Sequence, residues 1–348
     1  MAKSRRFMPN VSVALATCNG ERYLAAQLDS LARQTSHPSE LIIADDCSSD
    51  ESVKLIRNFA AKAAFPVRVI QNTVRVGYRA NFMQAAEACS GELIAFCDQD
   101  DIWHAEKLGR MRQPFQDPNV LLAYHNSTLI DDAGSAIGTV YRNRRTTKAF
   151  GPLNLHPWTI IPGHAQVVRR SLVRFTSLHR HSIDPYCTTE PMPHDQWYPF
   201  WASVLGTITY IPECLAQYRQ HGANLSGWPH IGWIAYVLDH ISNAEKYVSG
   251  ESLGARNRLE LLRRCVGQLH PDEMARVESA ISYYQALSKR SDQRLAVYDN
   301  PTWRGRARAL YTLVRQGDYV GRVSETLGIP ALLLDATIGL AFSNYARK

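Results

Sequence analysis

Residues 93–103 of the chain read LIAFCDQDDIW, an apolar run that ends in three closely spaced carboxylates. A short apolar run bounded by polar residues is typical of a buried β-strand. Aspartates directly after a strand direct hard oxygen ligands to one spot, and such ligands suit a divalent cation that holds a diphosphate. An acidic turn after a strand is the competing interpretation, and the triplet Asp98, Asp100 and Asp101 alone does not decide between the two.

Strand and helix patterns alternate over about the first hundred residues of the chain. Strands are predicted at residues 11–16, 41–44, 67–71 and 92–97, with helices at 23–34, 51–64 and 81–88 between them. This order predicts an α/β fold with a mostly parallel sheet, in which ligands bind at the carboxyl ends of the strands. The polar residues at those ends are Thr17, Asn19, Asp45, Asp46, Asp98 and Asp100.

Length and composition are those of an ordinary folded protein. The chain has 348 residues, of which 45% are hydrophobic and 20% charged, enough for one full α/β domain and a smaller second part. We expect the α/β domain at residues 1–228 and a helical region at residues 229–348. Seven cysteines without C-x-x-C spacing indicate neither a disulfide framework nor a zinc site.

Charge and hydropathy restrict the partners. A net charge of +7, spread along the chain, favours anionic partners such as nucleotides or lipid surfaces, and no nucleic-acid-binding motif accompanies it. The first residues lack the apolar core of a secretory signal, and no run reaches the ~20 apolar residues that span a bilayer. A cytoplasmic protein is the expectation.

Several motifs in sequence order make the chain resemble a known family. They are VSV at 11–13 with ATCNG at 16–20, QLDSL at 27–31 with QT at 34–35, IIADDCSSD at 42–50, VG at 76–77 with NF at 81–82, and GELI at 91–94 with the acidic stretch at 98–103. In order and spacing they resemble the family 2 glycosyltransferases with the GT-A fold, especially bacterial enzymes of surface-polysaccharide synthesis, rhamnosyltransferases among them. Many members have Pro-Thr-Tyr-Asn where residues 16–19 read ATCN, so an aromatic ring of the nucleotide pocket is absent here.

The resemblance implies a nucleotide-sugar site at the carboxyl edge of the sheet. It implies that Thr17 and Asn19 border the nucleotide, and that Asp46 accepts a hydrogen bond from the base of a UDP- or dTDP-sugar. Asp98 would approach the ribose, and Asp100 would bind the Mn²⁺ or Mg²⁺ ion that bridges the two phosphates. Carboxylates suit these tasks, since they accept hydrogen bonds from imide and hydroxyl groups and ligate hard cations. A turn and N-cap before the helix predicted at residues 51–64 is the alternative for Asp45 and Asp46.

The stretch RVGYR at residues 75–79 opens the next predicted helix. Its backbone N–H groups and the guanidinium groups of Arg75 and Arg79 could approach a diphosphate, and solvated surface arginines are the alternative. In the acidic stretch, we expect Asp101 to serve the outer shell of the metal and Trp103 to pack under the loop.

A catalytic base is expected further along, because no residue so far can activate an acceptor hydroxyl. His194 and Asp195 begin an apolar helical pattern. The family has an acidic residue facing the acceptor at the start of such a helix, so the resemblance implies that Asp195 is the base. His194 is the second candidate, and stabilisation of the helix end is the alternative for Asp195.

Residues 218–222 read YRQHG, a pattern that recurs in bacterial members of the family. It implies that His221 completes the metal shell or contacts phosphate, and a structural hydrogen bond is the alternative. An imidazole ligand would favour Mn²⁺ over Mg²⁺. Arg219 could offset diphosphate charge, and His164, after a strand predicted at residues 158–161, is a candidate for bordering the donor or acceptor sugar.

From about residue 229 the sequence changes to helical patterns, at residues 231–241, 256–269, 271–287 and 301–315. Pro271 and Pro301 stand at first-turn positions, where a missing N–H does no harm. The last pattern is basic and amphipathic. It either lies on an anionic membrane, in peripheral contact with its inner face, or packs on the α/β domain with a solvated basic face.

The residues and the resemblance together predict an inverting, metal-dependent transfer of a sugar from a nucleoside diphosphate. The acceptor would be a hydroxyl of a glycan or lipid-linked glycan, in the assembly of O-antigen or a related polysaccharide. Two rival classes remain. A nucleotidyltransferase typically has a Gly-rich, basic loop after its first strand, which residues 17–21 do not supply, and a non-catalytic sugar-nucleotide-binding module would need neither Asp195 nor the acidic cluster.

Overall fold

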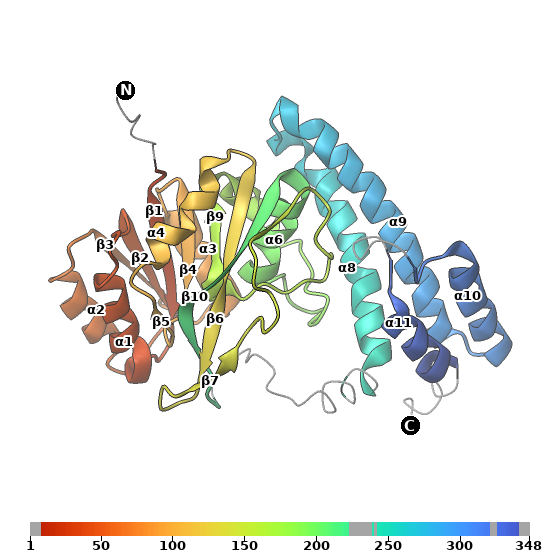
Figure 1. The fold of residues 1–348 in the computed structure, drawn as a ribbon, viewed down its shortest axis with the longest axis horizontal. Coiled ribbons are helices and arrows are strands. Elements are labelled where there is room, and N and C mark those ends of the chain that lie inside the picture. Colours follow the sequence, from red (N-terminus) through yellow and green to blue (C-terminus); the bar gives the residue numbers. More distant parts are fainter. Residues whose placement is uncertain (1–7, 223–238, 240–241, 321–325, 341–348) are drawn as a thin grey trace. The chain divides into compact units, whose positions relative to one another are not determined.

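The computed structural model describes residues 8–222, 239, 242–320 and 326–340. The chain folds into two compact units (Figure 1). Unit 1 comprises Met1–Gly151, Ile160–Thr176 and Pro193–Trp228, and unit 2 comprises Pro152–Thr159, Ser177–Met192 and Pro229–Lys348. The domain division at residue 228 stays a prediction, and two segments before it group with unit 2.

Unit 1 is built on one mixed, mostly parallel sheet. Its strands are β1 (Val11–Thr17), β2 (Glu40–Asp45), β3 (Val67–Gln71), β4 (Leu93–Cys97), β5 (Ile102–Trp103), β6 (Val120–Ile130), β7 (Ala136–Thr139), β8 (Lys148–Phe150), β9 (Gln166–Arg169) and β10 (Thr207–Arg219). The order is β3-β2-β1-β4-β9-β6-β10-β5, with β7 beside β6 and β8 beside β10. The first four strands are parallel, and β9 runs antiparallel between β4 and β6.

The sequence predicts the parallel half of this sheet well. β1 to β4 lie within one residue of their predicted bounds, because each is an apolar or alternating run closed by polar residues. The strand predicted at residues 158–161 is wrong, since these residues form a turn and an extended loop. Pro157 and Pro162 flank this segment and lack the N–H groups that a sheet ladder needs. β9 begins only at Gln166.

Helices pack on the sheet and bury its core. The helices up to residue 205 are α1 (Glu21–Ala32), α2 (Ser52–Ala60), α3 (Gly77–Ala88), α4 (Lys107–Met111), α5 (Thr176–His179) and α6 (His194–Leu205). On α1, the residues Leu24, Leu28 and Leu31 follow helical spacing and are buried against the apolar side chains of β1, β2 and β4. Each such leucine stabilises the fold by roughly 2 kcal/mol relative to an exposed position.

The loops that leave β1, β2 and β4 meet at one edge of the sheet, because parallel strands present their carboxyl ends to the same side. The register pairs Thr17 with Asp45 and Leu15 with Cys97. Asp46 continues this edge, and its N–H donates to the carbonyl oxygen of Thr17 at 2.8 Å. The polar residues predicted to share one edge therefore do so.

Unit 2 is helical. Its long helices are α8 (Ala244–Arg264), α9 (Met274–Asp299) and α10 (Trp303–Gln316), followed by the short helix α11 (Ile329–Leu334) and a π-helical turn at Asp335–Gly339. α9 runs between α8 and α10 and contacts both (Figure 1). The helices predicted at residues 256–269, 271–287 and 301–315 correspond to these three, and the one predicted at 231–241 falls almost wholly outside the described residues. Among the helices that the structure describes, none is long and apolar enough to cross a membrane.

A buried ionic group holds α9 against the turn that follows α11. Asp335 is fully buried and accepts hydrogen bonds from Arg294, Tyr298 and Tyr319 at 2.7 to 3.1 Å. Arg294 also donates to Glu251 of α8 at 3.0 Å. A buried charge with all its partners in place favours one arrangement of these helices, whereas a buried charge without them is costly.

We predict that Asp335→Ala lowers the free energy of unfolding of unit 2 by about 3 to 5 kcal/mol, because it leaves the buried Arg294 charge without its main partner. Urea denaturation followed by circular dichroism measures the loss. The control is Glu51→Ala, which removes an exposed ion pair with Lys54 and should leave stability nearly unchanged. Equally small effects of both substitutions would contradict the role assigned to Asp335.

Candidate active site

The loop after β4 holds three carboxylates at the carboxyl edge of the sheet. Asp101 is fully buried, and the side chains of Asp98 and Asp100 keep 31% and 15% of their surface exposed. β5 begins directly after Asp101 and pairs with β10, which fixes the far end of the loop. The inner carboxylate is therefore sealed, and the outer two are open to a ligand.

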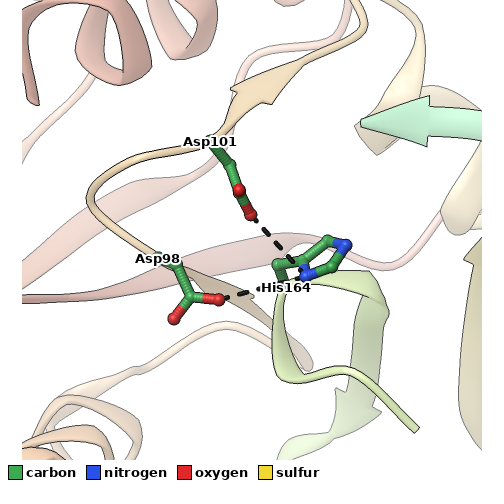
Figure 2. A group of neighbouring side chains, drawn as sticks. All are labelled: Asp98, Asp101 and His164. Atoms are coloured by element: carbon green, nitrogen blue, oxygen red, sulfur yellow. Dashed lines mark ion pairs between the residues drawn. The ribbon is translucent and has the colours of Figure 1, made fainter. Parts of the chain in front are cut away.

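His164 faces two of these carboxylates (Figure 2). Its Nδ1 atom lies 3.6 Å from Asp101 Oδ2 and 4.0 Å from Asp98 Oδ2. Asp101 Oδ2 is buried and has no hydrogen-bond partner among the described residues, so a cation would satisfy it. Ligand atoms from Asp98, Asp101 and His164 all lie within 4.8 Å of one another, and two carboxylates with an imidazole suit a divalent ion.

A second pair of ligand atoms lies at the same loop. His221 Nε2 is 2.9 Å from Asp100 Oδ2, and the Tyr23 ring of α1 packs beside the imidazole with 4.9 Å between ring centroids. The structure thus brings together the two residues that the sequence reasoning chose as metal ligands. A water-accessible carboxylate and imidazole in contact can share either a proton or a cation.

Arg219 fastens the end of β10 to the acidic loop. Its backbone N–H donates to Asp101 Oδ1 at 3.1 Å, and its Nε donates to the carbonyl oxygen of Asp100 at 3.0 Å. Its Nη1 reaches the carbonyl oxygens of Asp131 and Asp132. Arg219 is only 6% exposed. These contacts make it a residue that holds the loop, a role that the sequence reasoning did not predict.

Burial and crowding raise the pKa of two of these carboxylates, those of Asp98 and Asp101. Burial, followed by the charges of Asp100 and Asp195, raises the pKa of Asp98 to about 7. Burial and the charges of Asp100 and Asp98 hold the pKa of Asp101 well above its ordinary value. Burial lowers the pKa of Lys107 to about 7, although the acidic groups around it act in the opposite direction. A bound cation would reverse the shifts of the two carboxylates.

Lys107 and His164 form the inner wall of this cluster. Lys107 is fully buried, its Nζ donates to the carbonyl oxygen of His164 at 2.6 Å, and it lies 3.5 Å from the centroid of the Trp103 ring. His164 Nε2 lies 2.8 Å from Ser127 Oγ, and the Tyr218 ring packs on the imidazole at 4.3 Å. The sequence reasoning expected a sugar beside His164 and missed Lys107 and Ser127.

Gln99, which lies between Asp98 and Asp100, closes the loop after β1. Gln99 Oε1 accepts hydrogen bonds from Thr17 Oγ1 at 2.8 Å and from the Cys18 N–H at 2.9 Å. Asn19 has a positive φ of 49°, and its Oδ1 accepts from the Ser49 N–H at 2.8 Å. Thr17 and Asn19 lie at the expected edge, and each also has a protein partner that fixes the loop.

Asp46 supports the start of α3. It is 3% exposed, its Oδ1 accepts from the Val76 N–H at 2.7 Å, and its Oδ2 accepts from the Gly77 N–H at 2.8 Å. Asn72 adds a third contact at 3.2 Å. The N–H groups of Val76 and Gly77 are thus engaged by Asp46 and not available to a diphosphate. The approach of the other N–H groups of this segment to a diphosphate stays a prediction. Asp46 therefore caps α3. The sequence alternative was a cap of the helix predicted at residues 51–64.

Arg75 and Arg79, in the segment that opens α3, contact different parts of the structure. Arg75 Nη2 donates to Cys18 Sγ at 3.0 Å, so its guanidinium lies at the loop after β1. Arg79 is half-buried on α3, with its guanidinium carbon 4.8 Å from the centroid of the Tyr78 ring. Arg75 therefore contacts the loop that is expected to border the nucleotide. Nucleotide binding by Arg79 stays a prediction.

Asp195 lies in the first turn of α6, near enough for its charge to raise the pKa of Asp98. Gln166 of β9 fixes this turn by donating to the Asp195 carbonyl oxygen at 3.2 Å. His194 is 4% exposed, and its ring packs on that of Phe82 with 3.9 Å between centroids. His194 is thus a core residue, and Asp195 is the one of the pair that remains a candidate base.

The family model described as "Glycosyl transferase family 2" matches residues 12–175, which include the acidic loop and His164. These residues form a family 2 glycosyltransferase domain. The family expected from the motifs is therefore confirmed. The uncharacterized glycosyltransferase alr2836 of Nostoc sp. is 27% identical over 222 residues, which cover 62% of this chain and 66% of the relative.

Other relatives of the domain differ in what their names report. The Escherichia coli protein WfgD, named as a UDP-Glc:alpha-D-GlcNAc-diphosphoundecaprenol beta-1,3-glucosyltransferase, is 25% identical over 197 residues, 56% of this chain and 69% of its own. The uncharacterized protein Rv1520 of Mycobacterium tuberculosis is 27% identical over 216 residues, 61% of this chain. The match spans 59% of the length of that relative.

A solved structure shares the fold of this chain. The crystal structure of S. aureus TarS 1-349 in complex with UDP-GlcNAc aligns with a TM-score of 0.51 at 16% sequence identity, over 90% of this chain and 93% of that one. At this identity the likeness shows the fold alone. It supports the predicted GT-A architecture, an α/β domain with helices after it.

We predict that the affinity for Mn²⁺ rises between about pH 6 and pH 8, because the carboxylate with its pKa raised to about 7 must lose a proton before it can attract a cation. Isothermal titration calorimetry across this range measures the effect. Asp98→Asn should bind Mn²⁺ more weakly and with less pH dependence, whereas Asp29→Asn on the exposed side of α1 should behave like the wild type. A wild-type affinity that stays constant over the range would contradict the prediction.

Proposed function

We propose that the protein is an inverting, metal-dependent glycosyltransferase that moves a sugar from a UDP- or dTDP-sugar to a hydroxyl of a glycan or lipid-linked glycan. The observation that carries this proposal is the 2.9 Å contact of Asp100 with His221, beside Asp98 and Asp195. Asp98 and Asp100 lie within residues 12–175, which match the family 2 model. Acidic groups at this density favour a bound cation. A nucleoside diphosphate brings further negative charge that the same cation offsets.

The nucleotide of the donor is proposed to lie over the loops after β1 and β2. Thr17 and Asn19 would border it, Asp46 would accept from the base, Asp98 would approach the ribose, and Arg79 would approach the diphosphate. The common position of Thr17, Asn19, Asp46 and Asp98 in the loops after β1, β2 and β4 supports this arrangement. The solved TarS complex contains UDP-GlcNAc in a protein of the same fold, which supports a UDP-sugar as the donor.

Asp100 and His221 are the proposed ligands of Mn²⁺ or Mg²⁺. Their side chains are 15% and 11% exposed, so a diphosphate can reach an ion between them. Asp101 and His164, which we call the inner group, are almost fully buried, and the Lys107 amine that donates to the His164 carbonyl oxygen opposes a further positive charge. We therefore assign the inner group to holding the loop. When bound, the ion would neutralise charge that develops on the departing diphosphate.

Asp195 is proposed to act as the base in a single displacement. Its carboxylate takes the proton of the acceptor hydroxyl while the acceptor oxygen forms a bond to C1 of the sugar. The bond between C1 and the diphosphate oxygen breaks, and its electron pair leaves with the nucleoside diphosphate. Because attack comes from the face opposite the leaving group, the configuration at C1 inverts.

The acceptor and the location are inferred from relatives, since no side chain in the site identifies them. The name of WfgD gives a sugar on diphosphoundecaprenol as its acceptor. By analogy we infer a glycan or lipid-linked glycan of the cell surface, such as an O-antigen, extended in the cytoplasm at the inner face of the membrane. No nucleic-acid partner is proposed.

Asp195→Asn is expected to lower kcat by roughly 100- to 10,000-fold, the usual contribution of a positioned base, with the Kd of the UDP-sugar nearly unchanged. Release of nucleoside diphosphate from a panel of donors, in transfer or hydrolysis, gives kcat, and calorimetry gives Kd. Asp29→Asn is the matched control on the surface of α1. Loss of donor binding would show that Asp195 belongs to the donor site, and an unchanged kcat would show that Asp195 is not the base.

Electron paramagnetic resonance of bound Mn²⁺ separates the two sets of metal ligands. With ¹⁵N-labelled histidine, we expect imidazole nitrogen coupling in the wild type and in His164→Asn, and its loss in His221→Ala. The reason is that direct ligation brings the imidazole nitrogen into bonding contact with the ion, at about 2.0 to 2.1 Å in zinc sites. Nitrogen coupling that survives in His221→Ala and disappears in His164→Asn would show that the metal is bound by His164 and its neighbours instead of His221.

A further inference from the structure

α10 is a well-terminated helix with two different faces. Thr302 Oγ1 caps its N-terminus by accepting from the Gly305 N–H at 3.1 Å, and Gly317 ends it in the left-handed conformation at φ 74°. Leu310 and Leu313 form its buried face and pack in a cluster with apolar residues of α9. The packing of this inner face fixes the helix within unit 2 and leaves its outer face in solvent.

The outer face carries large apolar side chains. Trp303, Tyr311 and Val314 expose 62%, 65% and 50% of their surface. With 3.6 residues per turn, the three lie along one strip of the helix, within about a quarter of its circumference. Exposed apolar residues are ordinary when scattered, but a tryptophan, a tyrosine and a valine on one strip form a patch of the kind that marks an interaction surface.

A strip of arginines runs beside this apolar strip. Arg304, Arg308 and Arg315 are exposed, and their guanidinium groups make no hydrogen bond or ion pair with any residue that the structure describes. α10 contains four arginines and no acidic residue. By contrast, the exposed Arg264 of α8 is paired with Glu260 at 2.8 Å. The arginines of α10 are thus available to an anionic partner.

We propose that this face of α10 docks the protein on an anionic lipid bilayer. Tryptophan and tyrosine rings partition into the interfacial region, and arginines beside them bind lipid phosphates. A second copy of the chain would bring two arginine strips together, which like-charge repulsion opposes. An acidic protein surface would match the arginines and leave the apolar strip without a partner.

Docking through α10 adds a lipid bilayer to the partners of the proposed function. It rests on that function only because a lipid-linked acceptor is presented at a bilayer. The evidence for docking is otherwise independent of the active site, since every contact cited for it lies within unit 2. Vesicle binding and donor binding can therefore be measured separately, and each can fail without the other.

The test is flotation of the full chain with vesicles of phosphatidylcholine alone and with about 30% phosphatidylglycerol. We expect binding to the anionic vesicles that weakens as salt rises. The variant R304Q/R308Q/R315Q should lower the partition coefficient by roughly 100-fold, at about fivefold for each arginine near an anionic surface. The control R33Q/R57Q/K62Q removes three exposed cations of unit 1 and should bind like the wild type.

Trp303→Ala gives a second readout, because it removes apolar contact and no charge. It should weaken vesicle binding at low and at high salt, with the slope of the salt dependence unchanged. Circular dichroism and the Kd of a UDP-sugar without vesicles should match the wild type in all variants. Lack of wild-type binding to the anionic vesicles would overturn the proposal. So would equal binding by the triple variant and the wild type, or equal losses in both triple variants. Dimers that form without vesicles and disappear in Trp303→Ala would assign the face to a second copy instead.

Discussion

Repulsion between carboxylates is the constraint on which the candidate site depends. Three acidic side chains follow β4, a fourth begins α6, and burial together with their mutual charge raises the pKa values of Asp98 and Asp101. Lys107 lies inside the cluster, and burial lowers its pKa to about 7. The contact between Asp100 and His221 lies at the open side of the cluster. The site is therefore built to take up a cation together with an anionic ligand.

Hydrogen bonds between segments far apart in the sequence fix the loops that carry these carboxylates. Gln99 closes the loop after β1, Asp46 fixes the start of α3, and Arg219 joins the acidic loop to β10. Each of these contacts links segments at least thirty residues apart in the chain, so the edge behaves as one preorganised surface. Preorganisation matters for a transfer reaction, because donor, acceptor and base must be aligned before the bond to the diphosphate breaks.

The sequence predicts what depends on local pattern and misses what depends on pairing in space. β1 to β4 and the polar edge could be predicted, because apolar runs and the polar residues that end them are adjacent in the chain. The contact of His164 with Asp101 could not, since the antiparallel strand β9 brings it there from sixty-three residues away. The sequence suggests that Arg219 offsets diphosphate charge and assigns nothing to Lys107. Only the structure shows that Arg219 is buried and holds the acidic loop, and that the buried Lys107 donates to the His164 carbonyl oxygen.

The most direct test of this account is a crystal structure with Mn²⁺ and UDP, with anomalous scattering recorded at the manganese edge. The account predicts an anomalous peak in contact with Asp100 and His221, the UDP phosphates bound beside it, and the Asp195 carboxylate facing the open side of the same pocket. A peak enclosed by Asp98, Asp101 and His164 alone, or UDP bound with no peak near the acidic loop, would contradict it.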